Sequence, residues 1–212
     1  MDKKFKGIKF CLWDVDLTFY TISPQMKEEF KKRIYEYISR KLKIPINEAE
    51  QKYEEEFRKR KSKTATMEAL GLGKYAIQEV IDSIEKSKYL EREPRLIQLF
   101  KNLKHYKHAV VTNSTKASID ETLKILGLKK SLFEVIITKE DVSAYKPSPG
   151  PFLRVLKILG AKPEECVSIG DVENSDIIPA KKLGMKTIFV WGKSNHANTS
   201  VPAIYKIEEL LS

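Results

Sequence analysis

The stretch "IKFCLWDVDLTFY", Ile8 to Tyr20, joins a short apolar run to two aspartates that stand two residues apart. The run Ile8–Trp13 predicts a buried strand, so Asp14 and Asp16 follow directly at its end. Two like charges there repel each other unless water solvates them or a cation lies between them. The stretch therefore predicts either a solvated loop or a cation site, and the rest of the sequence has to distinguish the two.

Further strand-like runs occur later in the chain. They are short, rich in β-branched residues and, apart from Ser168, not interrupted by polar ones, which is typical of strands buried on both faces of a parallel sheet. The helical stretches between them run into glycines, the usual residues just beyond a helix C-terminus. Strand and helix in alternation predict an α/β fold with a doubly wound parallel sheet. The runs are Ala109–Thr112, Val135–Thr138, Cys166–Ile169 and Thr187–Trp191, and the glycines are Gly127, Gly160 and Gly184.

A helical segment interrupts this core after the first strand. Phe30, Ile34, Ile38 and Leu42 recur every four residues, which predicts one apolar stripe along a helix. We therefore expect two domains: residues 1–19 plus 93–212 as the α/β catalytic core, and residues 20–92 as an all-helical cap inserted into it.

Composition excludes several classes of protein. The chain of 212 residues is 42% hydrophobic and 32% charged, which suits a globular protein with a buried core. No apolar run is long enough to span a membrane, and the first residues do not resemble a secretory signal, so we expect a cytoplasmic protein without a membrane partner. The net charge is +10, but lysines alternate with glutamates, and no basic block contains stacking aromatics. We therefore expect no nucleic-acid partner.

Functional side chains follow the predicted strands. Ligands of open parallel sheets bind beyond the carboxyl ends of the strands. There the sequence places Asp14 and Asp16, then Thr112 and Asn113, then Lys146 in "YKPSPGPF", and then Asp171 and Asp176 in "VSIGDVENSD". Clustered carboxylates favour Mg²⁺, which prefers oxygen ligands and often shares them with a substrate phosphate. Lys146 and the Thr112 hydroxyl suit phosphate oxygens.

The spacing of Asp14 and Asp16 also suits phosphoryl transfer. A carboxylate can attack phosphorus and form an aspartyl-phosphate, while a second acid protonates the leaving alcohol and later deprotonates water. Other interpretations of single residues stay open at this point. Thr112 could cap a helix, Asp176 could be the N-terminal acid of the following helix, and Lys146 could be solvated. His105 and His108 flank a predicted strand start, and we expect both at the surface.

Four motifs stand in order along the chain. They are "DVDLT" at Asp14–Thr18, "VVTN" ending at Thr112 and Asn113, "KP" at Lys146 and Pro147, and "GDVENSD" at Gly170–Asp176. With each motif after a predicted strand and a helical insertion after the first, the chain resembles the haloacid dehalogenase superfamily. The resemblance covers nearly the whole chain and is specifically to the phosphatase branch with a helical cap.

The resemblance implies a role for each motif residue. Asp14 is implied as nucleophile and magnesium ligand, and Asp16 as general acid and base that also binds magnesium through its backbone carbonyl. Thr112, Asn113 and Lys146 are implied to hold the transferring phosphoryl group. Asp171 and Asp176 complete the implied metal site, with Asp176 as a ligand or an orienting partner.

The acid at position 16 is typical of members that act on phosphate esters, so the resemblance implies a magnesium-dependent phosphatase of small phosphomonoesters. A phosphomutase shares these motifs, and a non-enzymatic anion-binding module is the alternative outside enzymes. Two residues depart from the family pattern: Leu17 stands where Gly or Asn is common, and Phe19 where Leu is usual. The sequence leaves open the particular phosphomonoester and whether the protein is a monomer or a homodimer.

Overall fold

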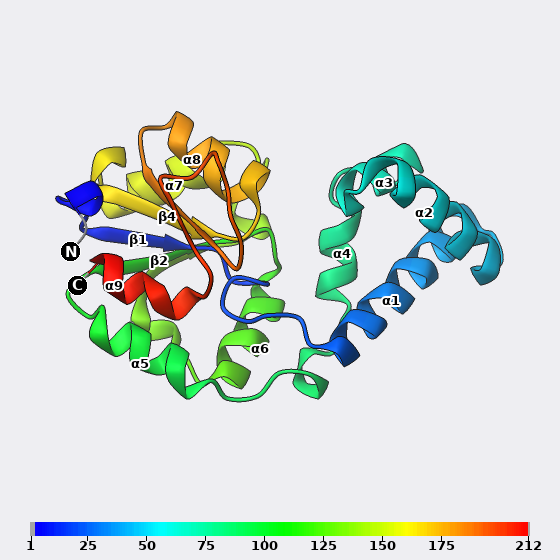
Figure 1. The fold of residues 1–212 in the computed structure, drawn as a ribbon, viewed down its shortest axis with the longest axis horizontal. Coiled ribbons are helices and arrows are strands. Elements are labelled where there is room, and N and C mark those ends of the chain that lie inside the picture. Colours follow the sequence, from blue (N-terminus) through cyan, green and yellow to red (C-terminus); the bar gives the residue numbers. More distant parts are fainter. Residues whose placement is uncertain (1–2, 212) are drawn as a thin grey trace. The chain divides into compact units, whose positions relative to one another are not determined.

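A computed structural model describes residues 3–211 of the chain. They belong to two compact units, Met1–Thr21 with Leu90–Ser212, and Ile22–Tyr89. The first unit contains a sheet with helices, and within the described residues the second consists of helices and their connections (Figure 1).

The sheet of the first unit is parallel throughout. Within residues 3–211 its order is β3-β2-β1-β4-β5-β6, and every neighbouring pair is parallel. The predicted doubly wound α/β fold is thus confirmed, with strand limits that lie within two residues of the predicted ones. Strand β6 was not among the predicted strands. The strands are β1 Phe10–Trp13, β2 Lys107–Val111, β3 Phe133–Ile137, β4 Cys166–Gly170, β5 Lys186–Val190 and β6 Thr199–Val201.

Strand β1 lies at the centre of the sheet and is buried on both faces. Trp13, its last residue, pairs with Val110 of β2 and Ile169 of β4. The carboxyl ends of these three strands are therefore neighbours, and the loops that follow them start at one edge of the sheet.

Helices cover both faces of this sheet (Figure 1). One face packs its alternate residues, such as Leu12 and Ala109, against Phe152 of α7 and Ala180 of α8. On the other face Trp13 packs against Phe100 of α5, with ring centroids 5.2 Å apart. The helices are α5 Pro94–Asn102, α6 Lys116–Leu126, α7 Gly150–Leu159, α8 Ile178–Lys182 and α9 Ile207–Leu211. The 3₁₀ turns are η1 Lys3–Phe5, η3 Lys130–Leu132, η4 Lys139–Asp141, η5 Pro163–Glu165 and η7 Ile204–Lys206, and η6 Glu173–Ile177 is a π-helical turn.

Local sequence signals set the ends of α6. The Thr115 side chain accepts a hydrogen bond from the Ser118 amide and caps the N-terminus. Gly127 adopts φ 79° at the C-terminus, a left-handed conformation that costs glycine little.

His108 of β2 corrects one expectation. It was predicted at the surface, but it is buried, with 4% of its surface exposed. Its Nδ1 accepts a hydrogen bond from Trp13 Nε1 at 3.1 Å, and its Nε2 lies 3.1 Å from the Leu103 carbonyl. Burial lowers the pKa of His108 from 6.5 to about 4, so the ring is neutral at pH 7.

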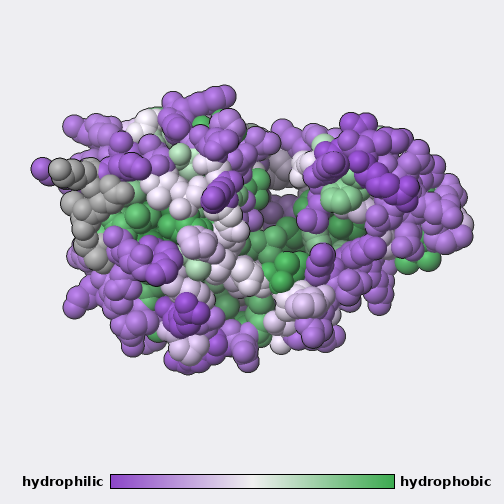
Figure 2. Space-filling model, viewed as in Figure 1, coloured by the Kyte–Doolittle hydropathy of each residue, from purple (hydrophilic) through white to green (hydrophobic). Residues whose placement is uncertain are grey.

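The second unit contains α1 Pro24–Leu42, α2 Ile46–Arg60, α3 Lys63–Ala69, α4 Ala76–Asp82 and the turn η2 Lys86–Lys88. Ser23 caps α1 by accepting from the Met26 amide. Along α1 the predicted stripe is buried at Phe30, Ile34 and Ile38. The visible surface of this unit is mostly hydrophilic (Figure 2). Among residues 3–211 no helix combines the length and apolar character needed to cross a membrane.

Candidate active site

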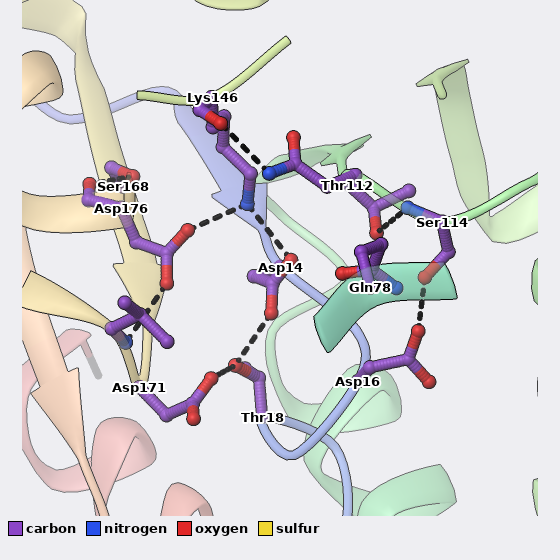
Figure 3. Close-up of polar contacts among 12 residues, drawn as sticks. Asp14, Asp16, Thr18, Gln78, Thr112, Ser114, Lys146, Ser168, Asp171 and Asp176 are labelled. Atoms are coloured by element: carbon purple, nitrogen blue, oxygen red, sulfur yellow. Dashed lines mark hydrogen bonds and ion pairs between the residues drawn. The ribbon is translucent and has the colours of Figure 1, made fainter. Parts of the chain in front are cut away.

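Asp14 follows β1 and continues its sheet register. Its amide donates to the Ile169 carbonyl at 2.9 Å, which fixes the backbone of Asp14 beside the end of β4. Its two carboxylate oxygens have different partners: Oδ1 lies 2.8 Å from Lys146 Nζ, and Oδ2 accepts from the Thr18 hydroxyl at 3.2 Å (Figure 3). The carboxylate is thus held in one orientation at the edge of the sheet.

Lys146 is a buried cation between two carboxylates. Its side chain is 3% exposed, and Nζ lies 2.8 Å from Asp14 Oδ1 and 2.6 Å from Asp176 Oδ1. Burial acts to lower the pKa of Lys146, but the carboxylates of Asp14 and Asp176 outweigh it and raise the pKa above its ordinary value. The interpretation of Lys146 as a solvated surface lysine is therefore wrong.

Asp171 and Asp176 come from the segment after β4. The Thr18 hydroxyl lies 3.0 Å from Asp171 Oδ1, so this one hydroxyl is shared between Asp14 and Asp171. Carboxylate oxygens of Asp14, Asp171 and Asp176 all lie within 4.8 Å of one another. The fold thus brings Asp14 of the first motif together with Asp171 and Asp176 of the last.

The charges of this cluster are out of balance. Burial raises the pKa of Asp14 from 3.8 to about 7, Lys146 opposes this rise, and Asp176 adds to it. Burial likewise raises the pKa of Asp171 well above its ordinary value, and Asp14 and Asp176 add to the effect. One lysine thus does not compensate the three clustered carboxylates, and a divalent cation would do so with the oxygen ligands that Mg²⁺ prefers.

Asp176 is held by contacts of its own. It lies in the turn η6, and its Oδ2 accepts from the Val172 amide at 3.0 Å. The Ser168 hydroxyl donates to the Asp176 carbonyl at 2.9 Å. Asp176 was also interpreted as the N-terminal acid of the following helix, α8, which begins two residues later at Ile178. Its carboxylate instead contacts Lys146 and the Val172 amide, so its role is not limited to that helix.

The loop after β2 supplies Thr112, Asn113 and Ser114. Thr112 does not cap α6, since Thr115 does; instead its Oγ1 accepts from the Ser114 amide at 3.1 Å. A hydroxyl that accepts one hydrogen bond can still donate another, so Thr112 can serve a phosphate oxygen. Asn113 Nδ2 donates to the Lys146 carbonyl at 2.9 Å, and its buried Oδ1 has no hydrogen-bond partner among the described residues. Asn113 thus fixes the backbone of Lys146, and its contact with phosphate stays a prediction.

Asp16 has different surroundings from the other acids. It is 7% exposed, and its carboxylate accepts from the Tyr20 hydroxyl at 2.7 Å and from the Ser114 hydroxyl. The three-carboxylate cluster does not include it. The two aspartates of the first motif therefore differ in these contacts: Asp14 lies against Lys146 and the Thr18 hydroxyl, and Asp16 accepts from the hydroxyls of Tyr20 and Ser114.

A family model described as "Haloacid dehalogenase-like hydrolase" matches residues 11–190. The chain belongs to the haloacid dehalogenase-like hydrolase family. The resemblance that the four motifs indicated is confirmed, and with it the assignment to a superfamily of hydrolytic enzymes.

Individual relatives agree with this assignment. Pyrophosphatase PpaX from Bacillus cereus (strain AH820) is 38% identical over 85 residues, which are 40% of this chain and 38% of that protein. The match thus spans well under half of that relative. The crystal structure of a HAD phosphatase from Thermococcus onnurineus is 29% identical with a TM-score of 0.68, covering 96% of this chain and 98% of that one. A putative β-phosphoglucomutase from Thermotoga maritima shares the fold, at 21% identity and a TM-score of 0.63, with 96% and 98% coverage.

The structure accounts for both departures from the family pattern. Leu17 has φ 61°, in the left-handed region where Gly and Asn are favoured, so the backbone at this position suits the residues of the family pattern better than leucine. Phe19 is fully buried and packs edge-on against Trp13, with ring centroids 5.8 Å apart. Both departures concern the backbone and packing of the loop, and neither side chain replaces a motif acid.

Thr18, Ser114 and Trp191 are further residues of the site to which the sequence patterns assign no role. Thr18 and Ser114 adjoin the motif residues, so their positions in "DVDLT" and "VVTNS" were the available signal. Trp191 follows β5 with φ 64°, and its Nε1 donates to the Thr18 carbonyl at 3.0 Å. Only its place at a strand end could have indicated that it supports the loop of Asp14.

Proposed function

We propose that the protein is a magnesium-dependent phosphatase that hydrolyses small phosphomonoesters through an aspartyl-phosphate on Asp14. One observation supports this most strongly. Asp14 is held between the cation of Lys146 and the carboxylates of Asp171 and Asp176, while a second acid with separate partners, Asp16, lies two residues away. This pairs a positioned nucleophile with an independent acid.

In the first half of the reaction, a carboxylate oxygen of Asp14 attacks phosphorus. A bond forms between that oxygen and phosphorus, the ester oxygen–phosphorus bond breaks, and the alcohol leaves with the proton of Asp16. Asp16 is then a carboxylate and takes a proton from water. The hydroxide formed attacks phosphorus, the bond to Asp14 breaks, and inorganic phosphate is released with both aspartates restored.

Charge neutralisation accompanies both halves. Lys146 lies 2.8 Å from Asp14 Oδ1, so it can neutralise phosphoryl oxygens that approach this carboxylate, and the Thr112 hydroxyl can donate to another. Mg²⁺ held by Asp14, Asp171 and Asp176, and by the Asp16 carbonyl as in the family pattern, would compensate the remaining negative charge of the substrate and carboxylates. The observed carboxylate cluster and the raised pKa values of Asp14 and Asp171 fit such an ion.

The substrate class is tested with a panel. It should contain small phosphomonoesters, and also inorganic pyrophosphate because the relatives from Bacillus are named pyrophosphatases. Phosphate release is measured with Mg²⁺, with a chelator, and for Asp14→Asn. Asp120→Asn is the matched control, since Asp120 is an exposed aspartate of the same unit paired with Lys130.

We expect Mg²⁺-dependent release that Asp14→Asn lowers by at least about a thousandfold, the usual scale for losing a nucleophile. Asp120→Asn should match the wild type. Full turnover by Asp14→Asn would refute the assigned nucleophile. Interconversion of sugar phosphate isomers without phosphate release would instead establish the phosphomutase alternative, and anion binding without any turnover would establish the non-enzymatic one.

A further inference from the structure

The partners of Asp16 carry an inference that rests on the proposed function and deepens it. The Tyr20 hydroxyl donates to Asp16 Oδ1 at 2.7 Å, and the Ser114 hydroxyl donates to Asp16 Oδ2. Figure 3 shows the Asp16 carboxylate turned toward Ser114, away from the contacts of Asp14 with Lys146 and Thr18. Each oxygen of Asp16 thus has its own hydroxyl donor.

These two donors reach Asp16 from different parts of the first unit. Tyr20 lies four residues after Asp16 in the same loop, and Ser114 lies in the loop after β2. Tyr20 is 7% exposed and Ser114 is fully buried, so neither hydroxyl is a freely moving surface group. A carboxylate with both oxygens held from two directions has little freedom to rotate.

The chemical type of the donors matters as much as their position. A lysine partner, such as the one that Asp14 has, favours only the ionised carboxylate. Hydroxyl groups can donate to a carboxylate and can also accept from a carboxylic acid. Tyr20 and Ser114 can therefore hold Asp16 in place both when it carries a proton and when it does not, as a group with two successive roles requires.

We infer that Tyr20 and Ser114 are positioning residues that orient Asp16 toward the oxygen of the leaving group. This orientation matters most for esters whose leaving group needs a proton. An alkyl alcohol is a poor leaving group without protonation, whereas 4-nitrophenolate leaves readily as an anion. Loss of either hydroxyl should therefore slow the hydrolysis of alkyl phosphates more than that of aryl phosphates.

The test compares kcat/KM for an alkyl phosphate, glycerol 3-phosphate, and for 4-nitrophenyl phosphate. This constant reports the step in which the leaving group departs. In Tyr20→Phe and in Ser114→Ala, we expect the alkyl-to-aryl ratio of kcat/KM to fall by about tenfold or more, the usual effect of one hydrogen bond to a charged group. Ser114→Thr keeps a hydroxyl and should restore most of the ratio.

Two controls separate positioning from a general structural effect. Tyr106→Phe also removes a buried tyrosine hydroxyl of this unit, one that donates to the Leu211 carbonyl at 2.7 Å, and it should leave the ratio unchanged. In an Asp16→Asn background the Tyr20→Phe change should no longer alter the ratio, because its effect passes through Asp16.

The outcomes are distinct. An unchanged or raised ratio in both Tyr20→Phe and Ser114→Ala, with aryl phosphate still hydrolysed, overturns the positioning role and leaves the phosphatase proposal standing. An equal effect of Tyr20→Phe with and without Asp16 also overturns it. Failure of the wild type to hydrolyse either ester, or any member of the panel above, overturns the proposed function and this inference together.

Discussion

Gly170, the last residue of β4, lies against the side chain of Asp176, and a methyl group on Gly170 would collide with the Asp176 carboxyl group. A β-carbon on Gly170 would lie 2.4 Å from Cβ, Cγ and Oδ2 of Asp176. Non-bonded carbon atoms prefer about 3.5–4.0 Å, so Gly170→Ala requires Asp176 to move by about 1 Å or more. The contacts of Asp176 with Lys146 Nζ at 2.6 Å and the Val172 amide at 3.0 Å would not survive that movement.

The size of the effect follows from these contacts. Overpacking a well-packed site costs about 1–3 kcal/mol, and losing a hydrogen bond to a charged group costs about 1.5–3 kcal/mol. We therefore expect Gly170→Ala to lower the free energy of unfolding by about 3–5 kcal/mol. The loss is large because Lys146 keeps only Asp14 as a partner while it stays buried.

Urea unfolding followed by tryptophan fluorescence measures this change. The chain has two tryptophans, Trp13 and Trp191, and both lie in the first unit, so the signal reports the unit that contains Gly170. Gly150→Ala at the start of α7 is the matched control, because a β-carbon there meets its nearest atom, the Ala144 carbonyl oxygen, at 3.3 Å. A change for Gly170→Ala of less than about 1 kcal/mol would refute the reasoning, since Asp176 would then be free to move.

Three further predictions concern pH, backbone strain and metal binding. Folded His108 takes up its proton at a lower pH than unfolded histidine, so the free energy of unfolding should fall as the pH drops from about 6.5 to 4. The fall should be about 3 kcal/mol larger in the wild type than in His108→Gln. Equal pH dependence of the two proteins in urea unfolding would contradict this. Leu17→Gly should raise the free energy of unfolding by about 0.5–1 kcal/mol, because relief of the backbone strain at φ 61° exceeds the entropy that glycine adds to the unfolded chain. A lower free energy of unfolding for Leu17→Gly, measured by thermal unfolding, would contradict this. Saturating Mg²⁺ should raise the Tm of the wild type by about 5–10 °C and that of Asp171→Asn much less, and equal shifts would exclude Asp171 as a ligand.

The sequence was most informative where the physical signal is local. Uninterrupted apolar runs such as Ala109–Val111 report burial on both faces, and this indicated the parallel sheet. The fold then brings Asp14, Asp171 and Asp176 together because they follow neighbouring strands. Topology, rather than any property of a single motif, makes that part of the site predictable.

Features that depend on distant partners were not predictable in the same way. His108 follows a polar segment in the sequence, and only its pairing with Trp13, 95 residues away, explains why it is buried. Strand β6 has three residues, too few for a periodic pattern, and forms because β5 offers a free edge. The partners of Asp16 are equally hidden, since Ser114 is 98 residues from it.

The identity of the nucleophile is tested most directly by trapping the phosphorylated protein. Asp16→Asn should still accept a phosphoryl group from 4-nitrophenyl phosphate, whose leaving group needs no acid, but should release it slowly because the base for water is gone. After acid quenching and digestion, mass spectrometry should find a phosphoryl group on the peptide that contains Asp14, and none in Asp14→Asn/Asp16→Asn. A phosphoryl group on another peptide, or none on the Asp14 peptide while the enzyme turns over, would contradict the account.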